Sequence, residues 1–156
     1  MLCRLVQRVA GTCALALALA GPATAARTSP AQASLLNAMN RTRAAYHLAP
    51  LRVDATLTRA AAAHTADMLR RHYFAHGDFS LRMRRYQVAG SIAGENLAWG
   101  VGSKSYAGTI VAEWLSSPEL RANLLSPSFR RVGIGRRIGT FAGYSGAAVV
   151  TADFAG

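Results

Sequence analysis

The chain has 156 residues, of which 51% are hydrophobic, so it is of single-domain size and has enough apolar side chains for a real core. Its 18 basic residues against 7 acidic ones give a formal net charge of +11. This charge favours anionic partners such as phospholipid headgroups, lipopolysaccharide or wall polymers. No nucleic-acid module is recognisable, so nucleic-acid binding is disfavoured. A genome rich in arginine and alanine codons would explain the charge equally well.

The first 26 residues are typical of a secretory signal peptide. Arg4 and Arg8 precede a short apolar run at 14–20, and small residues at 21–26 provide a cleavage site after Ala25 or Ala26. The run is too short to span a bilayer as a stable helix. We therefore predict a secreted or periplasmic protein with no transmembrane segment once the leader is cleaved. An uncleaved anchor is the weaker alternative.

Beyond the leader we predict a short connector at 27–29 and a single domain at 30–156. Both cysteines, Cys3 and Cys13, lie in the leader, so the exported domain must be stable without disulfides. Cleavage removes two arginines and no acidic residue, which lowers the net charge from +11 to +9. The exported domain is therefore still strongly basic.

Two helices are predicted in the first half of this domain. Ser29 and Pro30 form a helix start, and apolar residues at helical spacing continue the helix to about Tyr46. A second helix begins after Asp54, which is a good N-cap residue, and runs to about His72. Its apolar residues fall on one face, so it should pack against the core.

Two histidines and a basic segment come next. His64 lies on the apolar stripe of the second helix, which favours a hydrogen-bonded core histidine over a ligand or catalytic group. His76 follows an aromatic pair and precedes a Gly-Asp turn, so it either points into a cleft or closes the helix end on the surface. The segment Ser80–Tyr86 is interpreted as a short basic helix or turn whose three arginines form a solvated face.

The stretch Ala93–Trp99 is the most informative one for function. A carboxylate, Glu95, and an amide, Asn96, interrupt an otherwise apolar run, which predicts a buried strand or extended segment. A carboxylate in a low dielectric needs a cationic or hydrogen-bonding partner. That partner is either a histidine such as His76 or simply one of the many arginines.

The second half of the chain predicts a helix followed by strands. Ser103 should cap a third long helix that ends at Ser116–Pro118, and a further helical turn should run from Glu119 to Leu125. Alternating residues in the tail then predict two antiparallel strands, joined by a turn within Gly139–Gly146. Helices first and strands late predict an α+β domain.

Seven segments, taken in this order, resemble the bacterial branch of the CAP superfamily, also called SCP-like extracellular proteins. They are Asn40–Arg43, Leu48–Leu51, Phe74–His76, Gly94–Ala98, Trp114–Pro118, Arg121–Leu125 and Val132–Gly135. The resemblance implies a three-layer α-β-α sandwich with a central antiparallel sheet. It also implies that His76 and Glu95 face each other in a cavity, where some relatives bind a divalent metal. His47 stands where the family usually has glycine, and is interpreted as a left-handed helix terminator.

One position of the cavity motif departs from the family pattern. The second cavity histidine of the family follows Ser-Pro and one residue, where this chain has Leu120. Tight zinc sites need at least three protein ligands, so a zinc cofactor with His76 as its candidate ligand is disfavoured. Glu119 could be a third ligand, although its place on the helical turn points it elsewhere. The predicted cavity or binding residues are His76, Glu95, Asn96 and Glu119.

Three roles fit this set of residues. The favoured one is an exported non-catalytic binding module whose groove or cavity takes a lipid, a peptide or an envelope component. The second is a peptidase-like hydrolase with Glu95 as general base and His76 as general acid or metal ligand. Against it, the exported chain has no cysteine, and no serine lies in a recognised elbow sequence. In the third, the pair only holds a helix end to the sheet.

Overall fold

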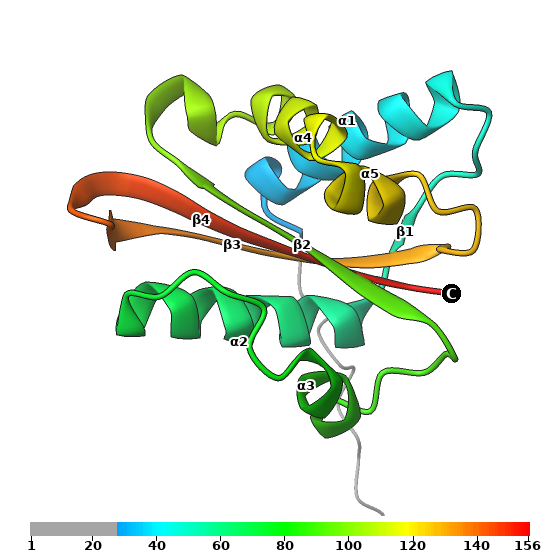
Figure 1. The fold of residues 1–156 in the computed structure, drawn as a ribbon, viewed down its shortest axis with the longest axis horizontal. Coiled ribbons are helices and arrows are strands. Elements are labelled where there is room, and N and C mark those ends of the chain that lie inside the picture. Colours follow the sequence, from blue (N-terminus) through cyan, green and yellow to red (C-terminus); the bar gives the residue numbers. More distant parts are fainter. Residues whose placement is uncertain (1–27) are drawn as a thin grey trace, which may run out of the picture.

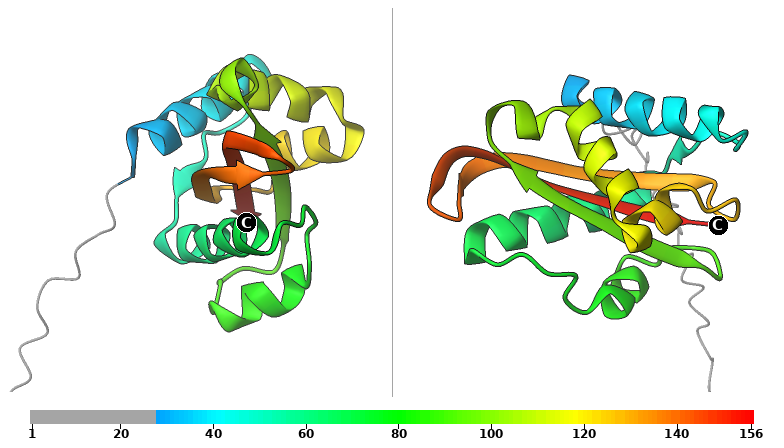
Figure 2. Two further views of the ribbon diagram at one scale, coloured as in Figure 1. Left: turned by 90° about the vertical axis from the view of Figure 1, so that its left-hand side faces the viewer. Right: turned by 45° about the horizontal axis from the view of Figure 1, so that its top comes forward.

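The computed structural model describes residues 28–156 as three layers, in which helices cover both faces of a central sheet (Figures 1 and 2). The predicted signal peptide lies outside the described residues. Within residues 28–156, no helix is both long and apolar enough to cross a membrane. In chain order the elements are α1 (Pro30–Ala45), β1 (Arg52–Val53), α2 (Ala55–Arg71), α3 (Phe79–Arg85), β2 (Ala93–Gly100), the 3₁₀ turn η1 (Gly102–Ser105), α4 (Ala107–Ser116), α5 (Pro118–Leu124), β3 (Arg131–Phe141) and β4 (Tyr144–Ala155).

The sheet has the strand order β1-β3-β4-β2. Its three long strands pair antiparallel, as predicted, and β4 lies between β2 and β3. The short β1 pairs parallel to β3, with Arg52 opposite Arg131, so the sheet is mixed overall. A strand of two residues carries no alternating pattern, which is why the sequence did not predict it.

Core side chains lie on both faces of the sheet, in one cluster on the face of α1, α4 and α5 and in two clusters on the face of α2 and α3. In Figure 1, α1, α4 and α5 lie above the sheet, and α2 and α3 lie below it. Successive residues of β4 point to opposite faces: Ala152 and Phe154 pack with the upper helices, whereas Val149 and Thr151 face α2. The three-layer α-β-α sandwich that the resemblance implied is therefore present.

Two glycines let α2 lie directly on β3. A Cβ atom at Gly133 would come 2.0 Å from the backbone carbon of Leu57, and one at Gly135 would come 2.3 Å from the carbonyl oxygen of Ala61. Only glycine permits this approach of helix and strand. The position of α2, which carries His64, is thus determined by the residues of β3.

α1 and α2 begin where their N-cap residues in the sequence indicated. Ser29 and Gln32 form a capping box in front of α1, and the carboxylate of Asp54 accepts two backbone hydrogen bonds at the start of α2. His47 has a φ of 57°, as expected for a left-handed terminator. Tyr46, expected on the apolar face, is instead 45% exposed just after α1 ends.

Two boundaries in the second half differ from the prediction. The third helix was expected to begin after Ser103, but residues 102–105 form a 3₁₀ turn and α4 begins only at Ala107. The turn expected within Gly139–Gly146 is only two residues long, because β3 extends to Phe141 and β4 begins at Tyr144. The hairpin strands therefore stay paired almost to the tip.

Candidate functional site

The candidate site lies on the α2 side of β2, where α3 and the loop after α2 also reach the sheet. Residues of β2 alternate between the two faces. Leu97 packs with α2, and the Asn96 amide reaches α5 on the other face. Glu95 therefore points to the α2 side, and its side chain is only 2% exposed. The buried strand with an enclosed carboxylate is confirmed.

Both carboxylate oxygens of Glu95 have partners. Oε1 lies 2.7 Å from Nδ1 of His76, and Oε2 accepts a hydrogen bond from Nη2 of Arg82. The His76 side chain is 55% exposed, so it separates the carboxylate from solvent, whereas the Arg82 side chain is 10% exposed. The sequence offered a histidine or an arginine as the partner, and the structure uses both.

Arg82 corrects the prediction that all three arginines of residues 80–86 form a solvated face. Arg84 and Arg85 are exposed, but Arg82 points to the sheet. Its Nη1 donates to the carbonyl oxygen of His76 at 3.1 Å, and its Nη2 lies 3.7 Å from Oδ1 of Asp153. A helix of seven residues makes too few turns for periodicity to identify its buried face.

Asp153 is a second site residue that the sequence analysis missed. β2 and β4 pair so that Glu95 lies directly opposite Asp153, which places two carboxyl groups side by side. Asp153 is fully buried, and neither of its carboxylate oxygens has a hydrogen-bond partner within the described residues. Burial, and then repulsion from Glu95, raise the pKa of Asp153 to about 8.

The carboxyl groups of Glu95 and Asp153 both lie near the guanidinium of Arg82. Burial raises the pKa of Glu95 to about 7, although the charge of Arg82 opposes this rise. Arg82 contacts Glu95 directly and lies farther from Asp153. At neutral pH the negative charge therefore belongs on Glu95, and the proton belongs on Asp153.

His64 from α2 closes the cluster from the other side. Its Nε2 lies 3.0 Å from the carbonyl oxygen of Ala75 and 3.7 Å from Oε2 of Glu95. Burial, and then the charge of Arg82, lower the pKa of His64 to about 4, so the ring is neutral near pH 7. The proton is assigned to Nε2, which donates it to the carbonyl. The predicted hydrogen-bonded core histidine is confirmed.

The structure does not bring Asn96 and Glu119 to this cluster. The amide of Asn96 donates to the carbonyl oxygen of Leu120 at 2.8 Å and accepts from Nδ2 of Asn123 at 3.1 Å, on the opposite face of β2. Glu119 is exposed on α5, and Leu120 packs against the core formed with α1 and α4. A side chain at position 120 is thus separated from the Glu95 carboxylate by the sheet. Binding roles for Asn96 and Glu119 stay predictions.

The cluster does not fit the divalent metal that the resemblance suggested. Across residues 28–156, no group of three or more His, Cys, Asp or Glu side chains is arranged to hold a metal ion. The oxygens of Glu95 already contact His76 and Arg82. A guanidinium at this distance would also repel a second cation.

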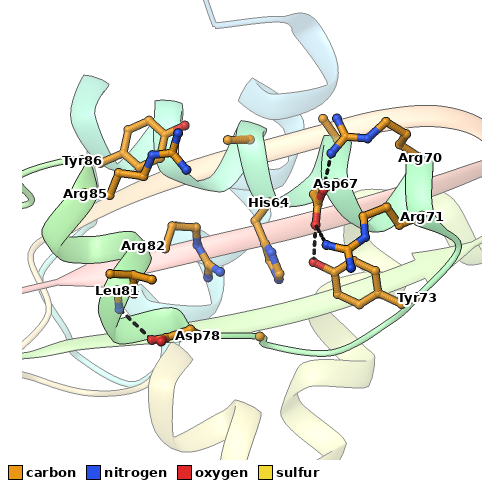
Figure 3. A pocket seen from close by; sticks show the side chains of 13 residues that line it. His64, Asp67, Arg70, Arg71, Tyr73, Asp78, Leu81, Arg82, Arg85 and Tyr86 are labelled. Carbon is orange, nitrogen blue, oxygen red and sulfur yellow. Dashed lines mark hydrogen bonds and ion pairs between the residues drawn. The ribbon is translucent and has the colours of Figure 1, made fainter.

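A groove with a volume of about 760 Å³ opens between α2 and α3, beside the cluster (Figure 3). His64 from α2 and Arg82 from α3 lie side by side at its centre and belong to the cluster as well. Its rim carries Arg70, Arg71 and Arg85. The groove therefore shares a wall with the site around Glu95.

Both acidic residues of the groove are held by the protein itself. Asp67 forms ion pairs with two of the rim arginines and accepts a hydrogen bond from the hydroxyl of Tyr73 at 2.8 Å. Asp78 accepts a hydrogen bond from the backbone of Leu81 at 2.8 Å and caps α3. Because Arg82 is paired with Glu95, three remaining arginines against two engaged acids leave the groove with a small net positive charge, and Leu81 and Tyr86 add apolar surface. Such a groove can hold an anionic group with an apolar part.

The chain is similar to known proteins over most of its length. The family model described as the cysteine-rich secretory protein family, CAP, matches residues 36–154. A protein of Bacillus subtilis (strain 168), YkwD, is 31% identical over an alignment of 129 residues that covers 73% of this chain and 49% of YkwD. The chain thus spans about half the length of that relative.

Solved structures share the fold. An extracellular protein with an SCP domain from Bacillus anthracis has a TM-score of 0.64 at 28% identity, covering 78% of this chain and 38% of that chain. An outer surface protein from Borrelia burgdorferi has a TM-score of 0.69 at 20% identity, covering 82% of this chain and 93% of that chain. The fold, the family model and the bacterial relative agree, and the chain belongs to the CAP family.

Proposed function

We propose that the protein is an exported binding protein, and that its groove between α2 and α3 takes an anionic envelope component. The ligand presents a carboxylate or phosphate group of a lipid, a peptide or a wall fragment. Export is supported by the predicted signal peptide and by the extracellular and outer-surface proteins among the similar structures. Binding is supported by the groove and its charge.

One observation carries the proposal: the carboxylate of Glu95 is enclosed, while the groove beside it is open. A general base must come within hydrogen-bond reach of the proton that it removes. Both oxygens of Glu95 are occupied by His76 and Arg82, so a substrate would first have to displace one of them. The groove, in contrast, falls within the range of about 300–1,000 Å³ that is typical of small-ligand sites.

The groove matches an anion in its available donors. Guanidinium groups bind carboxylate and phosphate through two parallel hydrogen bonds. Arg85 is exposed at the rim and forms no ion pair within the described part of the chain, so its guanidinium can receive an anionic group. Arg82 lies in the wall of the groove, where it is engaged by Glu95. The apolar part of the ligand would then contact Leu81 and Tyr86.

The test is a ligand titration of the processed protein, purified after expression of the full chain with its leader. Solubilised peptidoglycan fragments and palmitate serve as anionic probes, and an uncharged chitooligosaccharide serves as the control. Arg85→Gln should weaken binding of an anionic probe about tenfold, because one charge-assisted hydrogen bond contributes about 1.5 kcal/mol or more. Arg84→Gln, an exposed neighbour outside the groove, should bind as wild type does. Equal affinities in both variants, or no binding of either anionic probe, would contradict the proposal.

A hydrolase is the second candidate, because His76 contacts a carboxyl group whose pKa is raised to about 7. Groups of this kind exchange protons near neutral pH. The matched variant is Glu95→Gln, which keeps the shape of the side chain and removes the base. Peptide hydrolysis by the wild type that is lost in Glu95→Gln and in His76→Ala would favour this candidate. The binding proposal expects no hydrolysis by any of the three proteins.

A further inference from the structure

We infer that the end of the molecule formed by the β3–β4 hairpin is a docking surface for an anionic lipid bilayer. The surface shares only Arg71 with the groove between α2 and α3, so the inference can fail or succeed independently of the proposed function. It rests on the aromatic end, defined as Phe74, Trp99, Phe141 and Tyr144. These rings come from the loop after α2, the end of β2 and the two strands of the hairpin, which projects at the left of Figure 1.

Phe141 is the centre of the aromatic end. It is 3% exposed, and its ring centroid lies 5.5 Å from that of Trp99 and 6.3 Å from that of Phe74. Trp99 in turn lies 6.0 Å from Tyr144. Phe74 and Tyr144 remain 43% and 56% exposed, so this end presents more aromatic surface than is used to cover Phe141. Rings held by one another lose little further conformational freedom on binding.

The opposite face of the hairpin carries one exposed apolar side chain. Ile138 is 60% exposed and pairs with Ala148. Trp99 pairs with Val149, the next residue of β4. Residues one position apart in a strand point to opposite faces, so Ile138 points away from the aromatic end. The hairpin thus carries exposed apolar side chains on both faces.

Positive charge surrounds the aromatic end. Trp99 and Arg137 both lie opposite Val149 across the sheet, which places Arg137 on the aromatic face. Arg71, at the end of α2, pairs with Asp67 but keeps a side chain that is 68% exposed. The sequence has no acidic residue from Leu120 to Ala152, so the hairpin carries no negative charge. Each basic residue close to an anionic membrane strengthens binding about fivefold.

A bilayer fits this chemistry better than a glycan or a protein partner. Tryptophan and tyrosine favour the headgroup level of a membrane, where their polar atoms stay hydrated and their rings contact acyl chains. A sugar would stack on one face only and would leave Ile138 unused. A bilayer interface can surround the tip, so it covers both faces of the hairpin while Arg137 and Arg71 contact lipid phosphates.

Trp99 provides a natural reporter for the test. The chain has two tryptophans, and the other, Trp114, is 1% exposed in the opposite core. The processed protein is mixed with vesicles of phosphatidylcholine alone or of phosphatidylcholine with phosphatidylglycerol, and binding is measured by sedimentation. Binding is expected only with phosphatidylglycerol, together with a blue shift of the emission and quenching by brominated acyl chains.

Variants identify the surface. Tyr144→Ser alone removes only an exposed ring and should weaken binding severalfold, and Phe74→Ser with Tyr144→Ser should weaken it at least about tenfold. Tyr46→Ser is the matched control, since Tyr46 is also exposed but lies at the end of α1 beside Arg121. Melting curves check that each variant is folded. The inference is overturned by absent binding to phosphatidylglycerol vesicles, by unquenched Trp99, by full binding of Tyr144→Ser, or by capture on wall polymers alone.

Discussion

Replacing Asp153 with asparagine removes a buried ionisable group and keeps its shape. In the folded protein the pKa of Asp153 is raised to about 8, compared with 3.8 for an unperturbed aspartate. Between these values the folded chain holds one proton that the unfolded chain has lost. The free energy of unfolding of the wild type must therefore fall as the pH rises, and the loss is complete above the folded pKa.

The size of this effect can be worked out for a window in which few other groups contribute. One bound proton changes the free energy of unfolding by about 1.4 kcal/mol per pH unit. His64 acts in the opposite direction, since its pKa is lowered from 6.5 to about 4, but most of its contribution lies below pH 6.5. Between pH 6.5 and 8, loss of the proton from Asp153 should lower the free energy of unfolding of the wild type by roughly 1.5 kcal/mol. Loss of the proton from Glu95 should lower it by a smaller amount.

Urea unfolding of wild type and Asp153→Asn, followed by tryptophan fluorescence across this window, is the assay. The asparagine variant should be the more stable protein at pH 8 and should keep only the smaller slope from Glu95. Glu113→Gln, which removes an exposed carboxylate on α4, controls for the loss of a charge alone. Identical slopes in wild type and Asp153→Asn would show that the folded chain does not keep this proton, and the charge assignment of the pair would be wrong.

Two further substitutions test the packing around the site. Arg82→Gln leaves the buried carboxyl groups of Glu95 and Asp153 without their cation, and should lower the free energy of unfolding by about 3–5 kcal/mol at pH 7. The loss should be smaller at pH 5, where both carboxyl groups are protonated. Thermal melts at both pH values check this, with the exposed Arg84→Gln as control. Gly133→Ala places a Cβ 2.0 Å from the backbone of Leu57, so α2 must shift, at a cost of about 1–3 kcal/mol. Gly108→Ala in α4, where a Cβ would meet nothing within 4 Å, should be neutral or stabilising in the same urea titration.

The elements that could be predicted from the sequence are those with a repeated pattern or a side-chain cap. α1 and α2 satisfy both conditions, through Ser29 and Asp54. The tail strands alternate over enough residues to be recognised. Ser103 misled the prediction because a serine before an apolar helical pattern is also compatible with a 3₁₀ turn, and the α-helix begins only after it. The local sequence pattern cannot distinguish a 3₁₀ turn from the first turn of an α-helix.

Two of the five residues of the cluster could be found as site residues in the same way. Glu95 interrupts an apolar strand, and His76 stands at a break after a helix, so both were visible locally. Asp153 also interrupts an alternating apolar strand, so its signal was present too. What the sequence lacks is the register that places Asp153 opposite Glu95, because this depends on the pairing of strands more than fifty residues apart. A lone acid in a predicted buried strand is therefore a useful signal even without a motif.

Leu120 is less informative about Glu95 than the family pattern suggests, because the two side chains lie on opposite faces of β2. The partners of Glu95 come instead from α3 and from the loop after α2, and the decisive one is Arg82. A fixed guanidinium neutralises the carboxylate, as a metal ion would, and leaves no charge to attract one. The same short helix carries Arg85 at the rim of the groove. One element therefore encloses the carboxylate of Glu95 and makes the adjacent groove basic, and the proposed binding role requires both of these features.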